Sequence, residues 1–266
     1  IGVEDGANNS YCDLLFYVNA SKTIEEPNDR PVITPDDGNE PEKPDVTETK
    51  TGTLAFEDIW PGGGDYDMND VIVEYNRAVS FDKKNQVTKI VDTFTPVHDG
   101  AVFANAFAYQ VDKGQFGKMT FSATTEGIHT ESATSSIIVC PNVKQAIQKV
   151  YTITREFTGG SFNKKDLKSY NPYIIVKYAE GQKGRTEVHL PKHEATSLAD
   201  LSLAGTQKDA YYIDKEGAYP FAIDIPILNF ISVTEKKSID TEYPNFKAWA
   251  DSKGEKYTDW YNNHVN

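Results

Sequence analysis

Short runs of residues that favour β-strands follow one another along most of this chain, and they limit its fold more than any other feature. Val, Ile, Thr, Tyr and Phe recur in these runs at alternating positions, which is typical of strands with one buried face. Many short strands with few helices between them predict a mostly β fold, either a β-sandwich or a jelly-roll-like domain. We expect strands at 71–75, 79–82, 87–94, 102–109, 118–123, 135–139, 151–155, 173–179, 186–190, 211–213 and 221–225.

Two segments predict short helices. Residues 141–150 begin with Pro141, which suits the first position of a helix, and Val143, Ala146, Ile147 and Val150 share one face at helical spacing. A second short helix is expected around Phe246–Asp251. Both are expected to cap or cross the sheets.

Oxygen-bearing side chains are concentrated just before the first expected strand of the main body. The hexapeptide Asp-Tyr-Asp-Met-Asn-Asp follows three glycines and leads into Val71, and two further acids lie upstream. Because Ca²⁺ is held by six to eight oxygen ligands, this density predicts a structural calcium site. Its expected ligands are Glu57, Asp58, Asp65, Asp67, Asn69 and Asp70. The alternative is a tight turn whose acids only cap backbone amides.

The overall charge restricts the partners of the chain. The 266 residues carry a formal net charge of −13, whereas nucleic-acid binding depends on Lys and Arg that neutralise phosphates. We therefore expect neither a nucleic-acid ligand nor an anionic membrane surface as partner. No apolar run is long enough to span a membrane, and any export signal is expected to precede Ile1.

The composition divides the chain into three parts. Residues 23–51 are acidic and rich in Pro, which predicts an extended linker between a terminal segment at 1–22 and a β domain at 52–266. The terminal segment repeats part of the acidic region: Glu4-Asp5 matches Glu57-Asp58, and Asp13 matches Asp70, but several oxygen donors are missing. We interpret it as the last strand of a truncated preceding module.

That lone strand cannot bury its own apolar side chains, so we expect it to pair with the edge of a sheet. The residues expected to add to such an edge are Leu14, Leu15, Phe16, Tyr17 and Val18. Cys12 and Cys140 are the two cysteines of the chain, and either a disulfide between them or separate burial is compatible with the sequence.

Several segments resemble a known family. Residues 52–61 and 64–73, together with 100–107, 187–191, 243–249 and 259–262, are similar to the LruC-type domain, and the resemblance covers roughly 52–266. Residues 1–19 resemble a related, degenerate acidic calcium-motif module. The resemblance implies a secreted or lipid-anchored protein of a Gram-negative bacterium, located in the periplasm or at the cell surface, with no assigned enzymatic role.

Function follows less directly from the residues. No nucleophile elbow, phosphate loop or dinucleotide fingerprint is present, and Pro191 between His189 and His193 argues against a helical zinc site. We expect a non-catalytic surface module for binding or adhesion, with a surface glycan or protein as partner. One alternative is a carbohydrate-binding module that uses exposed aromatic residues, and a further alternative is a glycan-active enzyme. The candidate ligand-binding residues are Trp60, Tyr66, Trp249, Trp260, Tyr261 and Asn262.

Overall fold

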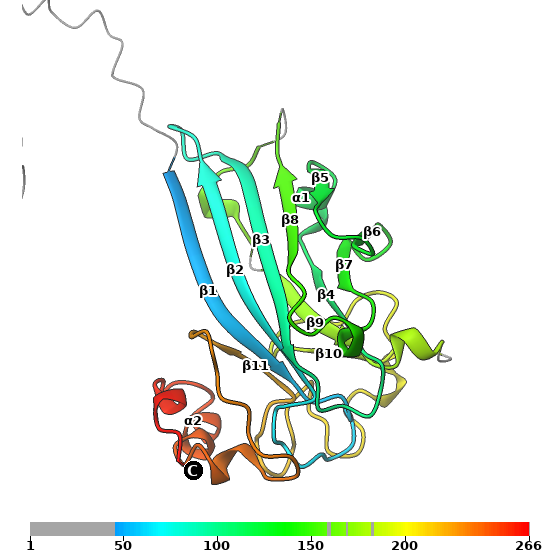
Figure 1. Ribbon diagram of the computed structural model, residues 1–266, viewed down its shortest axis with the longest axis vertical. Helices are drawn as coiled ribbons and strands as arrows, with labels where there is room; N and C mark the ends of the chain where they lie inside the picture. The colour runs from blue at the N-terminus through cyan, green and yellow to red at the C-terminus, as the bar shows by residue number, and fades with distance from the viewer. Residues whose placement is uncertain (1–45, 159–160, 169, 182–183, 266) are drawn as a thin grey trace, which may run out of the picture. The chain divides into compact units, whose positions relative to one another are not determined.

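The computed structural model describes residues 46–158, 161–168, 170–181 and 184–265, and within them the strands form two antiparallel sheets (Figure 1). The larger sheet contains, in spatial order, β11 (Ala222–Ile225), β1 (Val46–Phe56), β2 (Val71–Phe81), β3 (Val87–His98), β8 (Tyr151–Glu156) and β5 (Thr120–Ala123). The smaller contains β10 (Glu187–His189), β9 (Asn171–Ile175), β4 (Ala106–Gln110), β7 (Ser136–Cys140) and β6 (His129–Glu131). The predicted mostly β, sandwich-like fold is confirmed.

Helical structure is confined to short pieces. The α-helices of the described residues are α1 (Lys113–Phe116) and α2 (Phe246–Asp251), and α2 occupies the range predicted for it. Single 3₁₀ turns occur at Val143–Gln145, Lys164–Asp166, Tyr178–Glu180, Leu201–Leu203, Ile239–Thr241 and Trp260–Asn262. In the part of the chain that the structure describes, no helix has the length and apolar character needed to cross a bilayer.

Aromatic side chains join the two sheets. The ring of Phe94 on β3 lies 5.1 Å from that of Phe107 and 5.3 Å from that of Tyr109, both on β4. Phe56, at the end of β1, lies 6.3 Å from Phe107. Each such ring buries about 150–250 Å². The core therefore forms between the sheets where the alternating pattern of the strands places their apolar faces.

A buried ionic cluster lies within this interior. Asp92 on β3 accepts hydrogen bonds from Arg77 Nε at 2.7 Å, Arg155 at 2.8 Å and the Tyr109 hydroxyl at 3.1 Å. The Arg77 guanidinium also lies 3.9 Å from the ring centre of Tyr170. Burial alone would raise the pKa of Asp92, but the two guanidinium groups outweigh it and lower that pKa. Asp92 is therefore a carboxylate that links β2, β3, β8 and β4.

The observed strands differ from the predicted ones: β1 was not predicted at all, β4 begins at 106 where a strand was expected from 102, and β9 ends at 175 where it was expected to reach 179. Residues 46–51, assigned to the linker, form the first half of β1 and pair with β2 in a regular register. Their side chains are largely exposed, so hydrophobic patterning does not reveal them. The predicted strand at 211–213 is a turn region that contains only an isolated bridge at Ile213. The short strand β6 was not predicted, and its residues are mostly exposed as well.

The predicted helix at 141–150 is wrong beyond its first turn. Val143–Gln145 form a 3₁₀ turn, after which Gln148 adopts a φ of 65° that a right-handed helix does not allow. The backbone N–H of Gln148 donates to the carbonyl of Pro96 at 2.8 Å. A tertiary hydrogen bond to β3 thus replaces helix continuation, and Ile147 and Val150 are left exposed.

The predictions for residues 1–45 lie outside the described residues. They include the terminal strand at 14–18, the degenerate acidic motif and most of the linker at 23–51. Cys12 belongs to the same stretch. Cys140 is buried at the end of β7, where its sulfur lies 3.5 Å from the Tyr151 hydroxyl oxygen.

Candidate metal centre

The hairpin of β1 and β2 brings the two acidic segments of the sequence together. In its antiparallel register Phe56 pairs with Val71, so the residues after β1 meet the residues before β2. Glu57 and Asp58 therefore lie beside the end of the loop at 69–70. Pairing of the two strands is the local reason that carboxylates twelve residues apart in sequence become neighbours.

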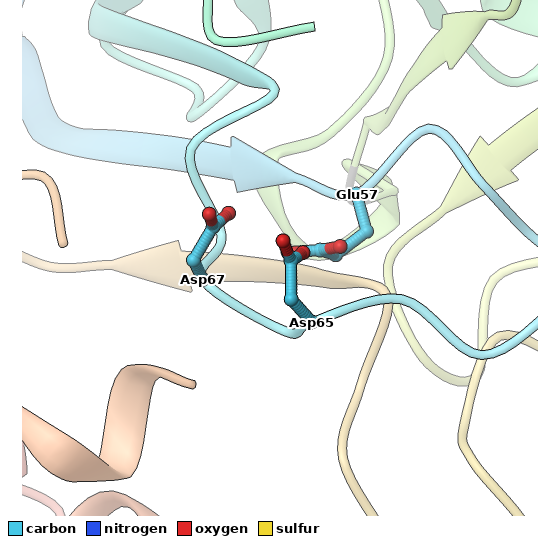
Figure 2. A group of neighbouring side chains, drawn as sticks. All are labelled: Glu57, Asp65 and Asp67. Atoms are coloured by element: carbon cyan, nitrogen blue, oxygen red, sulfur yellow. The ribbon is translucent and has the colours of Figure 1, made fainter. Parts of the chain in front are cut away.

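Three carboxylates converge at the mouth of this hairpin. Glu57, Asp65 and Asp67 each offer a carboxylate oxygen, and these oxygens all lie within 4.8 Å of one another. Figure 2 shows the three side chains directed toward a common space, with Glu57 leaving the end of β1 and the two aspartates on the loop. Gly64 permits this approach, because a Cβ there would lie 2.7 Å from Glu57 Oε2.

Two residues of the loop, Tyr66 and Met68, have left-handed backbone conformations. Tyr66 and Met68 have φ values of 56° and 55°, a left-handed region that residues with a Cβ seldom adopt. Both side chains are buried, and the Tyr66 hydroxyl donates to Asp214 at 2.5 Å. The apolar residues thus anchor the loop in the core while Asp65 and Asp67 turn toward Glu57. Residues with strained backbone conformations are concentrated at ligand-binding and active sites, where side chains must be held in one geometry.

The electrostatics of the three acids are unfavourable to full ionisation. Burial raises the pKa of Glu57 well above its usual range, and the negative charges of Asp70, Asp67 and Asp65 raise it further. The Met68 N–H, which donates to Glu57 Oε1 at 2.6 Å, opposes this shift. Burial likewise raises the pKa of Asp67. Among the described residues, no Lys, Arg or His forms an ion pair with any of these three acids.

Asp58 and Asp70 form a neighbouring but separate pair. The Asp58 N–H donates to Asp70 Oδ2 at 2.8 Å, and Asn105 Nδ2 donates to Asp58 Oδ2 at 2.6 Å. Burial and the charge of Asp58 raise the pKa of Asp70 to about 8. These two predicted ligands thus already have hydrogen-bond partners outside the three-acid group.

Asn69 carries a buried oxygen that has no hydrogen-bond partner among the described residues. Its side chain is 2 % exposed, its Nδ2 donates to the carbonyl of Val233 at 3.3 Å, and its Oδ1 accepts no hydrogen bond from the described residues. Gly100 packs against that oxygen so closely that a Cβ would lie 2.4 Å away. A buried acceptor without a donor costs about 1–3 kcal/mol. A cation or a water would remove that cost.

The candidate centre is also joined to the C-terminal part of the chain. Asp67 Oδ2 accepts from the Lys236 N–H at 3.0 Å, and the Ile239 N–H donates to the Tyr66 carbonyl at 2.8 Å. With the Asn69–Val233 bond, these contacts connect the loop to residues 233–239. No sequence motif pointed to residues 233–239, because this segment contacts the loop through its backbone and not through its side chains.

The structure corrects the expected row of exposed aromatic residues. Trp60, Tyr66 and Trp260 are buried: Trp60 Nε1 donates to Asp209 at 2.6 Å, and Trp260 packs against Phe246. These three rings are core residues and cannot stack on a sugar. Trp249 and Tyr261 are partly exposed, and Asn262 is exposed.

His189 and His193 do not form a zinc site. His189 is fully buried, with Nδ1 2.8 Å from Asn171 Oδ1 and Nε2 2.9 Å from Glu187 Oε2. Both of its ring nitrogens are therefore occupied by protein groups. His193 lies on the loop after β10, and its Nδ1 is 3.3 Å from the Pro191 carbonyl.

Comparison with known proteins supports the fold and identifies a family. No curated protein sequence matches the chain. A solved structure described as a "Putative lipoprotein from Bacteroides ovatus" is similar, with a TM-score of 0.58 and 17 % sequence identity; the match covers 83 % of this chain and 75 % of that one. A family model described as "Domain of unknown function (DUF4842)" matches residues 85–261, a range that begins after the acidic loop. The chain thus belongs to the DUF4842 family.

Proposed function

We propose that this chain is a non-catalytic, calcium-stabilised β module of the LruC type, which acts in binding or adhesion at the surface or in the periplasm of a Gram-negative bacterium. The observation that carries the proposal is the convergence of Glu57, Asp65 and Asp67, to which no basic side chain of the described residues is paired. Three like charges held this close destabilise the fold unless a cation or protons neutralise them.

The spacing of the oxygens suits a shared calcium ion. Oxygens bound at 2.3–2.6 Å to one Ca²⁺ lie at most about 4.6–5.2 Å apart, and the three carboxylate oxygens lie within 4.8 Å. Hard oxygen ligands without nitrogen or sulfur favour Ca²⁺ over zinc. Asp65 is exposed, so the site has a route to solvent, and the unpartnered Asn69 Oδ1 adds a further oxygen to the same loop.

A bound ion would act on stability and not on a reaction. It would neutralise the loop that Tyr66 and Met68 anchor in the core, and so hold residues 233–239 through Asp67 and Asn69. The likeness to the Bacteroides ovatus structure agrees with a surface-associated module. Exported modules commonly use calcium in this structural way, with dissociation constants of about 10⁻⁴–10⁻³ M.

The experiment is a thermal melt after EDTA treatment, followed by titration with Ca²⁺ and, separately, Mg²⁺. At a Ca²⁺ concentration of 100 times the dissociation constant, binding to the folded state adds about 2.7 kcal/mol. For a domain of this size that corresponds to a rise in Tm of about 5–10 °C. A melting curve that Ca²⁺ leaves unchanged would refute the calcium proposal.

Asp65→Asn is the sharpest variant, because the Asp65 side chain is exposed and accepts no hydrogen bond from the described residues. It should fold normally and lose most of the Ca²⁺ response. Asp67→Ala should abolish the response, but it also removes the acceptor for Lys236. Glu126→Gln, at an exposed acid outside the cluster, is the matched control and should respond like the unchanged protein.

A further inference from the structure

A second feature of the molecule is an apolar cavity of about 440 Å³ beside β11. It lies between the loop after β10, the strand β11 and the residues at the end of α2, the helix beside β11 in Figure 1. Its apolar wall is contributed by Leu190, Pro191, Ile213, Pro220, Ile223 and Trp249. Pockets that hold small ligands have volumes of about 300–1,000 Å³ and mainly apolar walls.

Trp249 gives this cavity an aromatic side with a free polar edge. Its ring packs against those of Phe246 and Trp260, with centroids 5.3 and 5.5 Å away, so its position is set by the core. Its indole N–H donates no hydrogen bond to the described residues. Gly254, at a φ of 82°, also lines the cavity and has no side chain to cover this edge, whereas a Cβ at that position would lie 3.6 Å from Nε1. A ligand acceptor could therefore reach the indole.

The charges around the opening are not balanced. Asp224 is paired with Lys50 at 2.9 Å, and Asp251 is paired with Lys247 at 2.7 Å. Lys192 and Lys253 also line the cavity, and both are exposed without an ion pair in the described part of the chain. The uncompensated charge at this opening is therefore positive, although the whole chain carries −13.

We propose that this cavity binds a small amphipathic anion: a carboxylate whose apolar body occupies the space beside Trp249 and whose charged group lies between Lys192 and Lys253. The apolar wall offers few groups for the hydroxyls of a sugar, whereas it suits an aliphatic or aromatic body. The two lysines provide charge complementarity. This inference uses residues remote in sequence from the acidic loop and does not depend on calcium.

The probes are 2-naphthaleneacetate and its neutral amide, with decanoate as an aliphatic carboxylate. Binding is measured by NMR of the three tryptophan indole N–H signals, in EDTA and again with Ca²⁺. Both carboxylates should shift the Trp249 signal in a saturable way. The signal of Trp60, whose N–H is held by Asp209, should not move. The neutral amide should bind more weakly.

Variants separate the charge from the fold. Lys192→Gln and Lys253→Gln alter exposed side chains, and each should weaken carboxylate binding about 1.5- to 5-fold without changing binding of the amide. Lys89→Gln, an exposed lysine on β3, is the matched control and should have no effect. Trp249→Ala removes the reporting indole, so binding to this variant is measured from the line broadening of the ligands' own NMR signals; both ligands should bind at least about tenfold more weakly.

Three results would overturn the proposal: no saturable shift of the Trp249 signal at millimolar carboxylate, equal affinity for the acid and the amide, or lysine variants that bind like the unchanged protein. A neutral oligosaccharide that saturates the Trp249 signal more tightly than either carboxylate would also overturn it. A failed calcium response leaves these measurements unaffected, because they are read in EDTA as well.

Discussion

The buried carboxylate of Asp92 should be among the most important single groups for stability. Asp92→Ala removes the acceptor of Arg77, Arg155 and the Tyr109 hydroxyl, and it leaves two guanidinium groups in the core, one of them 1 % exposed. Removing one partner of a buried ion pair costs about 3–5 kcal/mol. Because two cations lose their counterion here, we expect the upper end of that range, about 5 kcal/mol.

The assay is urea unfolding at pH 7 with saturating Ca²⁺, followed by circular dichroism and tryptophan fluorescence. Asp92→Asn, which keeps the shape and one acceptor oxygen, should cost about 3 kcal/mol. Asp166→Asn, an exposed acid on a 3₁₀ turn, should change the unfolding free energy by no more than about 0.5 kcal/mol. A second change, Arg155→Met, should recover part of the loss in the Asp92→Ala background, because it removes one of the uncompensated charges.

The dependence on pH provides an independent check. The pKa of Asp92 is lower in the folded protein than the ordinary value of 3.8, so the folded state binds this proton less readily than the unfolded state. Its contribution is therefore complete above pH 3.8 and is lost as the pH falls through the folded pKa. Asp92→Asn should flatten the acid limb of the stability curve. A loss below about 1 kcal/mol on Asp92→Ala would refute the reasoning.

Two further outcomes follow from close contacts and buried charges. Gly64→Ala should weaken the calcium response by about 1–3 kcal/mol, because its Cβ would lie 2.7 Å from Glu57 Oε2. Gly63→Ala is the control and should keep the response, because the atoms nearest its Cβ belong to the flexible end of the Lys208 side chain. Equal calcium responses of the two variants in thermal melts would contradict the proposed site. Glu187→Ala should lower the free energy of unfolding in urea by about 3–5 kcal/mol. The Glu187 carboxylate is fully buried, pairs with Arg185 at 2.5 Å and accepts a hydrogen bond from the Thr196 hydroxyl. A loss as small as that of an exposed acid would show that this buried ion pair does not stabilise the fold.

Strand patterning predicted much of the sheet framework. Alternation of apolar residues located most of β2, β3, β7 and β8, because a strand with one buried face needs that pattern wherever it pairs. It missed β1 as a whole: the exposed side chains of its first half carry no such pattern, and its second half is continuously buried and does not alternate. It also predicted a helix at 141–150, where the hydrogen bond from Gln148 to Pro96 prevails over local periodicity.

Local sequence located the loop of the candidate metal centre, but it could not show which of the expected ligands converge. The oxygen-rich hexapeptide pointed to the loop, and three of the six expected ligands converge: Glu57, Asp65 and Asp67. That Asp58 and Asp70 form a separate pair depends on Asn105, which lies on a different part of the chain. The sequence also could not show that Trp60, Tyr66 and Trp260 are buried, since an aromatic residue suits a core and a binding surface equally well.

The sequence by itself thus determined the class of fold and the position of the acidic loop, because both depend on residues that are close along the chain. Only the tertiary structure decided which acids share one space, how residues 233–239 join the loop, and that Lys192, Trp249 and Lys253 line one cavity. The physical reason is that local patterns specify which face of a segment is buried. Which distant segment covers that face is set by packing of the whole core.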